Sequence, residues 1–151
     1  ASSPTTDDGF ALPALALDIG QARIGVAVCD RGGRISRPLT VISRRDRAWP
    51  EKVAALAHAY GCRGVVVGLP VHMDGTPSEQ TEDVRRAVEE LKRALPLPVR
   101  FQDERLSTFV AEQRLSERGI PARAQKEIVD AEAAAVILED FLAAWRRCAR
   151  S

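Results

Sequence analysis

Two short apolar runs near the N-terminus, separated by only four residues, constrain the fold of this chain more than any other feature. Residues Ala14–Ile19 read ALALDI, and residues Ile24–Cys29 read IGVAVC. Runs of this length suit buried strands, and the four residues between them, Gly20–Arg23, predict a hairpin turn. A second turn at residues 30–33 leads to a third predicted strand over Arg34–Ile42. The N-terminal part is therefore expected to form three consecutive antiparallel strands.

The remainder of the chain alternates helix and strand signals. A helix is expected from Trp49, with Pro50 in its first turn, to Gly61, which suits a helix stop. The elements expected after it are a central strand at Gly64–Gly68, a helix from a capping box at Thr76–Glu79 to Pro96, a strand at Leu97–Phe101, a helix from a cap at Ser107 or Thr108 to Gly119, and a last helix over about Arg123–Arg147. This order predicts an α/β domain with a mixed five-stranded sheet and helices on both faces.

The length of 151 residues suits one domain that buries its core without disulfides. We expect this domain over residues 14–147, after a flexible N-terminal tail at residues 1–13 that lacks the features of a signal peptide. No apolar run approaches the roughly 18 residues of a membrane span. Cys29, Cys62 and Cys148 lack metal-ligand spacing and indicate reduced thiols in a cytoplasmic protein. The net charge of +1 provides no global positive field, so contacts with nucleic acid must depend on local charge.

Asp18 is a carboxylate within an otherwise apolar strand. Burying an ionised carboxylate costs several kcal/mol unless the group is paired or binds a cation. Asp18 shares one side of the strand with Ala14 and Ala16, whose small side chains leave room beside it. Two interpretations follow: the N–H groups of the next turn satisfy Asp18, or Asp18 faces a functional site.

Asp130 raises the same question on the last predicted helix. The apolar residues on its side of that helix, at spacings of 4, 7, 8 and 11, are Ala134, Ile137, Leu138 and Phe141. Asp130 is therefore expected to point into the domain and to require a partner. Glu127 and Glu132 fall outside this stripe and are expected to be solvated.

The segment Asp103–Thr108, DERLST, follows a predicted strand. Asp103 and Glu104 point to opposite sides if that strand continues, so at most one of them faces the same space as Asp18. Sites in sheets of this kind collect beyond the C-terminal strand ends, where Asp18, DERLST and the loop at residues 68–76 would meet. Carboxylates that converge there repel one another unless a cation lies among them. Oxygen ligands suit Mg²⁺ or Mn²⁺ rather than zinc, and pairs of such ions serve phosphodiester cleavage.

Four segments, in this order along the chain, together resemble the YqgF/RuvX family. They are Leu17–Gly20 followed by Arg23–Val28, Val67–Pro70 with Met73–Thr76, Asp103–Thr108, and Lys126 with Val129-Asp130, Ala133-Ala134 and Ile137-Leu138. The resemblance extends from Ala14 to Leu142 and has one departure, because His72 stands where the family commonly has Asn.

The resemblance implies an RNase H-like fold with strand order 3-2-1-4-5 and a metal-dependent nuclease related to Holliday-junction resolvases. In bacteria the family is associated with trimming the 5′ end of precursor 16S rRNA. The residues that carry over as catalytic and metal-binding are Asp18, Glu104 and Asp130. They would hold Mg²⁺ or Mn²⁺, with two ions expected.

Five side chains in or beside these motifs are expected to contact nucleic acid: Arg23, His72, Arg105, Arg123 and Lys126. On the predicted helix Lys126 precedes Asp130 by one turn, so it either reaches a scissile phosphate or pairs with that Asp. Other basic clusters, such as Arg44–Arg47, are expected to be solvated. The sequence shows no aromatic stacking platform of the kind that single-strand binding proteins use.

Two functions remain open from the sequence. One is a metal-dependent nuclease for structured nucleic acid, and the other is a non-catalytic nucleic-acid-binding or ribosome-assembly factor on the same fold. ATP hydrolysis of the actin-like type is disfavoured, because it requires a second similar domain. The sequence does not choose between branched DNA and precursor rRNA, because one fold serves both. A homodimer is expected if two strands are cut symmetrically.

Overall fold

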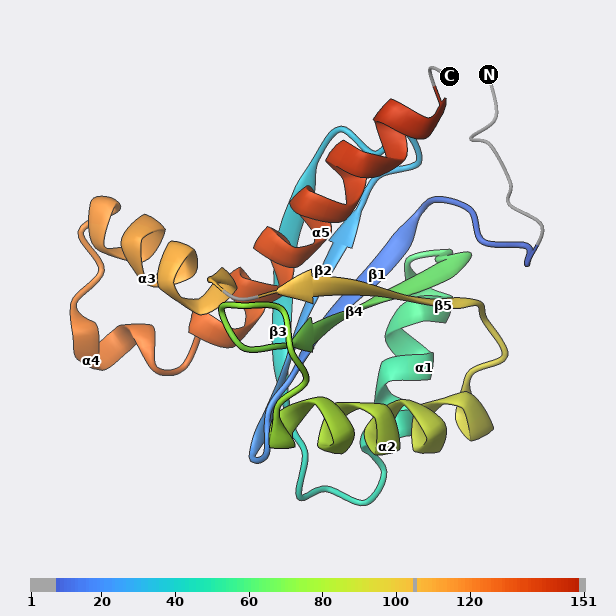
Figure 1. Cartoon of the computed structure of the whole chain (residues 1–151), viewed down its shortest axis with the longest axis horizontal. Helices are drawn as coiled ribbons and strands as arrows, with labels where there is room; N and C mark the ends of the chain where they lie inside the picture. Colours follow the sequence, from blue (N-terminus) through green and yellow to red (C-terminus); the bar gives the residue numbers. More distant parts are fainter. Residues whose placement is uncertain (1–7, 105, 150–151) are drawn as a thin grey trace.

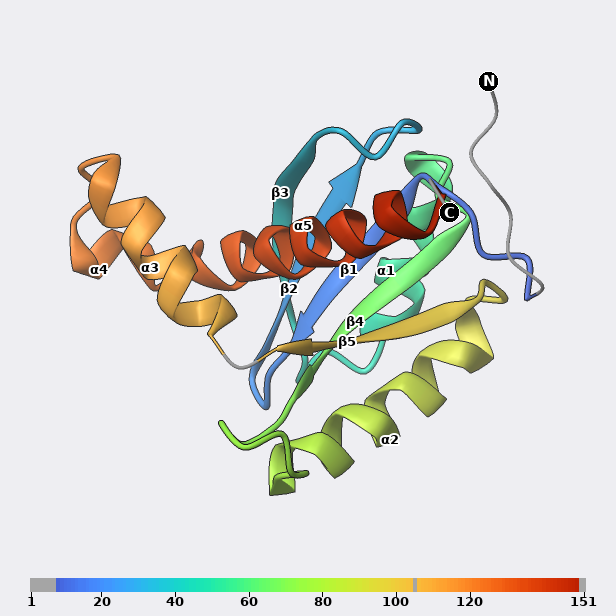
Figure 2. The same ribbon diagram turned by 45° about the horizontal axis from the view of Figure 1, so that its top comes forward.

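The protein forms a five-stranded mixed sheet with helices on both faces (Figures 1 and 2). A computed structural model describes residues 8–104 and 106–149. The strands are β1 (Ala14–Ile19), β2 (Arg23–Cys29), β3 (Ser36–Ser43), β4 (Gly64–Pro70) and β5 (Val99–Glu104). The helices are α1 (Trp49–Ala59), α2 (Glu79–Ala94), α3 (Ser107–Glu117), α4 (Ala122–Gln125) and α5 (Val129–Ala149). The strand order β3-β2-β1-β4-β5 confirms the predicted topology.

The first three strands pair antiparallel, and β4 and β5 add to the other edge of β1 in parallel. The parallel half results from helical crossovers, because α1 leads from β3 to β4 and α2 leads from β4 to β5. The C-terminal ends of β1, β4 and β5 therefore lie at one edge of the sheet, where the site is found.

The alternation of side chains along β1 divides the core into two layers. Leu15, Leu17 and Ile19 pack in a cluster with residues of α1 and α2. Ala14 and Ala16 face the opposite layer, which α5 covers. Asp18 shares their side of the strand, so the same alternation directs its carboxylate toward α5 rather than into the larger apolar cluster.

Two glycines allow α5 to lie close to the sheet. A Cβ atom on Gly25 would clash with the backbone of Asp130, and one on Gly68 would clash with Ile137. Because Gly25 on β2 has no side chain, the start of α5 lies directly against the sheet. This placement also fixes the position of Asp130. A larger residue at position 25 would displace the helix that supplies one carboxylate of the site.

The predicted flexible tail is too long at its C-terminal end. Residues Phe10–Leu12 are buried, and the Phe10 ring lies 5.3 Å from the ring of Phe141 and 5.4 Å from that of Trp145. This aromatic group closes the α5 layer of the core near the start of β1. Burial of Phe10 explains why the chain is ordered before residue 14, while residues 1–7 lie outside the described part.

The segment predicted as one last helix forms two helices, α4 and α5. The reason is that Gln125 ties α4 to the end of α3. Gln125 is buried, and its side-chain amide donates hydrogen bonds to the Ile120 carbonyl oxygen (2.8 Å) and to Ser116 Oγ (3.1 Å). These bonds hold α4 against the end of α3, and a turn at residues 126–128 precedes α5. Lys126 therefore does not lie one helical turn before Asp130, and that expectation is wrong.

Helix starts and strand ends also differ locally from the predictions. The capping box lies at Ser78 and Thr81 rather than at Thr76 and Glu79, because Thr76 instead donates to Asp74 Oδ1 within the preceding loop (2.7 Å). Ser107 is the first residue of α3, and the N-cap, Leu106, makes no side-chain cap. Strand β5 continues to Glu104 because it pairs with β4 as far as Pro70.

Within the described residues, no helix is long and apolar enough to cross a membrane. All three cysteines are unpaired; Cys29 and Cys62 are buried, and Cys148 is exposed.

Candidate active site

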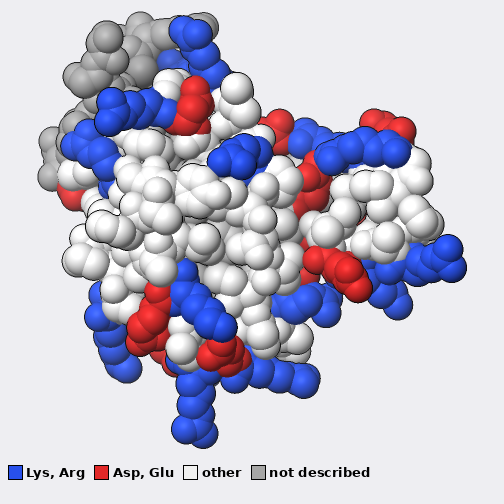
Figure 3. Space-filling view, turned by 180° about the vertical axis from the view of Figure 1, so that it is seen from behind, with Lys and Arg blue, Asp and Glu red and all other residues white. Residues whose placement is uncertain are grey.

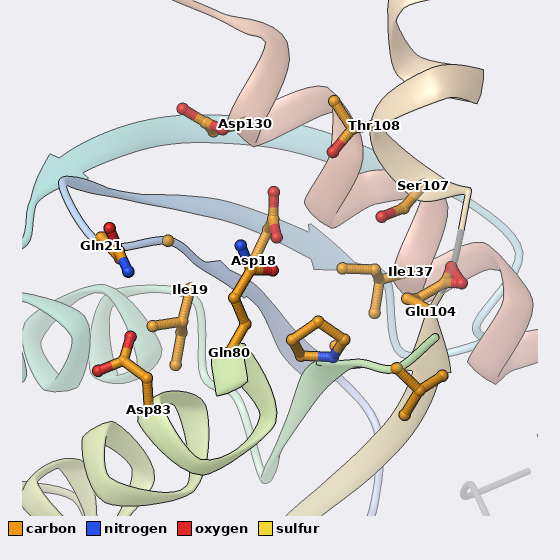
Figure 4. Close-up of a pocket in the computed structure, with 14 residues that line it drawn as sticks. Asp18, Ile19, Gln21, Gln80, Asp83, Glu104, Ser107, Thr108, Asp130 and Ile137 are labelled. Atoms are coloured by element: carbon orange, nitrogen blue, oxygen red, sulfur yellow. The ribbon is translucent and has the colours of Figure 1, made fainter. Parts of the chain in front are cut away.

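A polar pocket of about 320 Å³ lies beyond the C-terminal ends of β1, β4 and β5 (Figure 4). Its carboxylates are Asp18, Asp83, Glu104 and Asp130. Its walls are formed by the end of β1 and the turn after it, the ends of β4 and β5, the starts of α2 and α3, and the first half of α5. The structure therefore brings the three carboxylates that the sequence singled out to one cavity.

Asp18 is a carboxylate without a compensating partner among the described residues. Burial raises its pKa to about 7, and the charge of Asp130 adds to the effect. The N–H of Gly20 in the following turn donates to the Arg23 carbonyl oxygen (2.8 Å). None of the hydrogen bonds found among the described residues satisfies the Asp18 side chain from this turn. The structure therefore disfavours the interpretation in which the turn satisfies Asp18.

Glu104, at the end of β5, has a similar environment. Its Oε1 atom is buried and has no hydrogen-bond partner among the described residues. Burial raises the pKa of Glu104 to about 8, together with a hydrogen bond to Asp140 and the charges of Asp140, Asp18 and Asp103. An orphaned buried carboxylate oxygen beside a second unpaired carboxylate marks a place for a cation.

Asp103 and Asp140 complete the surroundings of Glu104. Asp103 is exposed, as expected for the neighbour that points to the opposite side of the strand. Asp140 belongs to α5 and was not identified from the sequence, because nothing local indicates that α5 passes beside the end of β5. Only the crossing of the helix over the sheet brings Asp140 to Glu104.

Asp130 lies in the first turn of α5 and is paired with a cation from the protein itself. The Nε atom of Arg23, at the start of β2, donates to Asp130 Oδ2 at 2.7 Å. The bond and the charge of Asp130 raise the pKa of Arg23. In Figure 4 the Asp130 carboxylate lies at the edge of the pocket, whereas Asp18 extends into it. The partner that Asp130 requires is thus Arg23 and not Lys126.

The donor set fits a hard divalent cation, since Asp18 and Glu104 offer carboxylate oxygens for which residues 8–104 and 106–149 supply no positive partner. As they stand, no three His, Cys, Asp or Glu side chains in the described part are grouped closely enough to hold an ion. Asp18 and Glu104 could hold such a cation. Asp130, whose Oδ2 atom accepts a hydrogen bond from Arg23, is a third candidate ligand.

Arg44 supports the wall of the pocket opposite α5. Its guanidinium donates to both carboxylate oxygens of Asp83 and to the carbonyl oxygen of Gly20 (3.0 Å). These bonds link the end of β3, the start of α2 and the turn after Asp18. Because Arg44 stands in a run of charged residues, the sequence predicted a solvated side chain, and the structure shows this expectation to be wrong.

The α3 and α4 helices form a lobe, residues 107–125, that projects from the sheet and presents Ser107 and Thr108 to the pocket (Figures 1 and 4). Ion pairs of Arg114 with Glu139 and of Arg118 with Glu132 hold the lobe to α5. Glu132 is buried, so the prediction of a solvated side chain is wrong. That prediction considered only the apolar stripe of α5, and the stripe does not reveal that α3 covers a second side of the helix.

The four predicted nucleic-acid contacts that the structure describes do not gather in the pocket. Arg23 borders it through Asp130, and Arg105 lies outside the described residues. Arg123, Lys126 and His72 are exposed and do not line it. His72 belongs to a loop closed by the bridge between Val71 and Pro77. On the face shown in Figure 3, basic and acidic side chains alternate around a broad uncharged area, in keeping with the small net charge.

Comparisons with known proteins agree with this architecture. The family model described as "RuvX: Holliday junction resolvase" matches residues 13–144. A protein named "Putative pre-16S rRNA nuclease" from an Anaeromyxobacter species is 48% identical over 129 residues, which cover 85% of this chain and 94% of the relative. A protein of the same name from Thermosynechococcus vestitus is 42% identical over 140 residues, which cover 91% of each chain.

Among solved structures, Thermus thermophilus RuvC in complex with a Holliday junction superposes with a TM-score of 0.51 at 18% identity, covering 88% of this chain and 95% of that one. The Fowlpox virus resolvase complexed with junction DNA gives a TM-score of 0.52 at 12% identity, covering 88% and 98%. At these identities the likeness concerns the fold, which is RNase H-like. With the family model matched along nearly the whole domain, the chain belongs to the RuvX family.

Proposed function

We propose that this protein is a divalent-metal-dependent nuclease that hydrolyses phosphodiester bonds in structured nucleic acid, with the 5′ end of pre-16S rRNA as its principal substrate. The observation that carries the proposal is the orphaned, buried Oε1 atom of Glu104 beside the unpaired carboxylate of Asp18. The names of relatives at 48% and 42% identity support the choice of rRNA.

In this mechanism Asp18 and Glu104 would hold Mg²⁺ or Mn²⁺, and Asp130 would be a third ligand. Bound divalent ions of this kind supply an activated water and stabilise the leaving oxygen in phosphodiester hydrolysis. Arg23 would pair with a phosphate of the substrate. Ser107 and Thr108 at the start of α3 add hydroxyl donors on the opposite wall.

The remaining basic residues would act at a greater distance from the scissile bond. Arg123, Lys126 and His72 are exposed and lie outside the pocket lining. We retain them, with Arg105, as proposed contacts for flanking phosphates. Such contacts contribute affinity that decreases as salt rises.

Resolution of Holliday junctions is a second candidate, favoured by the description of the matching family model. Symmetric cutting of a junction would require two copies of the pocket, and therefore a homodimer. A non-catalytic binding or assembly factor would not need two unpaired carboxylates beside each other, because their repulsion lowers stability with no return in function.

The proposal is tested with wild type and Asp18→Asn, each offered a 5′-extended 16S precursor, a single-stranded RNA and a four-way DNA junction in Mn²⁺. We expect wild type to cut the precursor and Asp18→Asn to be inactive while it retains the thermal unfolding midpoint. Undiminished cleavage by Asp18→Asn would exclude this pocket as the active site. Absence of metal-dependent cleavage of all three substrates by wild type would favour the binding factor.

A further inference from the structure

Several large apolar side chains that are exposed to solvent belong to the segments that form the pocket. Seven such residues occur in the described part of the chain. Four of them lie within two residues of a pocket-lining residue: Met73, Leu106, Phe109 and Ile128. We refer to these four as the apolar rim. The segments that carry them group beyond the strand ends in both ribbon views (Figures 1 and 2).

Phe109 is the most informative member of the rim. It is 57% exposed, although it directly follows Thr108, which lines the pocket. Helix α3 packs on α5 through Ala111 and Leu115, which are buried. With 3.6 residues per turn, Phe109 lies about 200° around the helix from Ala111 and points away from α5. Leu106 is three residues before it, on the same side, and is 51% exposed.

The surroundings of Phe109 suit a base rather than a phosphate. A shallow hollow beside its ring is lined by Glu112, Gln113, Ser116 and Glu117. The two carboxylates repel phosphate groups, whereas Gln113 and Ser116 can hydrogen-bond to the edge of a base. An aromatic ring stacks on any base, because every base has a π-face.

A continuous duplex cannot use this surface. Its bases are stacked inside the helix, and an exposed aromatic ring beside it meets only sugar and phosphate. Apolar side chains at the mouth of a phosphodiesterase pocket therefore gain contact only when the nucleotides next to the scissile phosphate are unpaired and unstacked.

We propose, resting on the nuclease function above, that Phe109 and Leu106 bind an unstacked base next to the scissile phosphate. The enzyme then selects an unpaired strand that flanks structured nucleic acid, and it discriminates against continuous duplex. The sequence alone shows no stacking platform, because nothing in it marks Phe109 as exposed. Its exposure depends on how α3 docks on α5.

The test measures binding in the Asp18→Asn background, so that cleavage does not interfere. One RNA is used unpaired or annealed to its complement, with 2-aminopurine beside the expected cleavage position. The variants are Phe109→Ala and Phe109→Trp. The control is Tyr60→Ala, which removes an aromatic side chain, 39% exposed, from a hollow beside Pro13 at the other end of β1.

We expect Phe109→Ala to weaken binding of the unpaired RNA by roughly tenfold, within the range for loss of one stacked base. Phe109→Trp should retain the affinity and the quenching of 2-aminopurine, and Tyr60→Ala should match the parent. Binding of the annealed RNA should be weaker in all variants and insensitive to residue 109. Equal binding of unpaired RNA by Phe109→Ala and the parent, or a preference for the duplex, would overturn the proposal.

A four-way DNA junction in the same assay identifies the source of the base. If Phe109→Ala also weakens binding of the junction tenfold, the base on Phe109 comes from an opened branch point. If only binding of RNA is weakened, the base comes from the unpaired RNA strand. Because these measurements do not depend on cleavage, they are separate from the activity test of Asp18→Asn. Loss of stacking with intact cleavage chemistry, or the reverse, therefore distinguishes failure of this inference from failure of the proposed function.

Discussion

Two groups of acidic side chains, one in the pocket and one at the contact between α3 and α5, have opposite environments. In the pocket, Asp18 and Glu104 have no positive partner among the residues that the structure describes, and burial raises the pKa of both. At the contact between α3 and α5, Glu132 is only 4% exposed, yet it is paired with Arg118. Carboxylates are removed from water in both groups. Only in the second group does a positive side chain of the described protein, Arg118, offset the cost of desolvation.

This difference separates carboxylates that hold the fold together from carboxylates that await a ligand. A buried acid with a guanidinium partner stabilises the arrangement of two helices, and removal of that partner leaves an uncompensated charge. Two adjacent acids without a positively charged partner lower the free energy of unfolding until a cation binds between them. The pair of Arg23 with Asp130 lies between these cases, because both residues are partly accessible.

The largest effect is expected for Glu104→Gln, which removes one charge from the unpaired group. Cleavage should fall by roughly 1,000-fold or more, because several kcal/mol of transition-state stabilisation depend on the metal site. The free energy of unfolding of metal-free protein should stay the same or increase, since repulsion with Asp18 is relieved. Activity assays and urea denaturation check both parts, and a destabilised but active variant would contradict the comparison.

The opposite pattern is expected at the contact between α3 and α5. Arg118→Ala leaves Glu132 buried without its partner and should lower the free energy of unfolding by roughly 1–3 kcal/mol. This is less than for a fully buried pair, because the Arg118 side chain is 53% exposed. Cleavage by the folded protein should remain measurable. The control is urea denaturation of the double variant Arg118→Ala, Glu132→Gln, which should regain part of the lost free energy of unfolding. If the double variant regains none, the ion pair does not account for the loss.

The stability of metal-free protein should decrease as pH rises. The pKa values of Asp18 and Glu104 are raised to about 7 and about 8 from ordinary values of 3.8 and 4.5. Between these limits the folded state binds more protons than the unfolded state, so the contribution of both groups falls from about pH 4 to pH 8. Thermal unfolding in chelator should show this decrease, and Mg²⁺ should reverse it at pH 8. A flat pH dependence identical to that of the Asp18→Asn, Glu104→Gln double variant would contradict the environments described above.

The smallest effect is expected for Arg23→Ala, which breaks the partly accessible pair of Arg23 with Asp130. The free energy of unfolding should change by at most about 1 kcal/mol, because the Arg23 side chain is 55% exposed. Binding of single-stranded RNA should weaken, and its salt dependence should lose about 0.7 from the slope if Arg23 contacts one phosphate. Arg93→Ala, an exposed residue of α2, is the matched control and should leave the slope unchanged.

Local patterns were sufficient for most of the fold. The hairpin of β1 and β2 follows from two apolar runs with a turn between them, and the strand order agrees with the family resemblance. The break between α4 and α5 could not be predicted, because it depends on the hydrogen bonds of Gln125 to α3 and to the turn that follows it. Burial of Phe10 likewise depends on Phe141 and Trp145, which are more than a hundred residues away along the chain.

The candidate site could be predicted where burial and residue type disagree. A carboxylate in an apolar strand or on an apolar helix stripe requires an explanation wherever it occurs, and this pointed to Asp18 and Asp130. The partners were not accessible in this way. The contacts of Asp130 with Arg23 and of Glu104 with Asp140 join residues with no local pattern in common.

The sequence by itself determined which elements form, which of their faces are apolar, and which carboxylates are buried against preference, because these depend on periodicity and on the cost of desolvating charge. Only the tertiary structure decided which buried carboxylates have a positive partner and which do not. It also decided that Phe109 faces solvent beside the pocket rather than the core. The physical reason is that pairing and exposure depend on distances between elements, and these are set only when α5 crosses the sheet and α3 docks on α5.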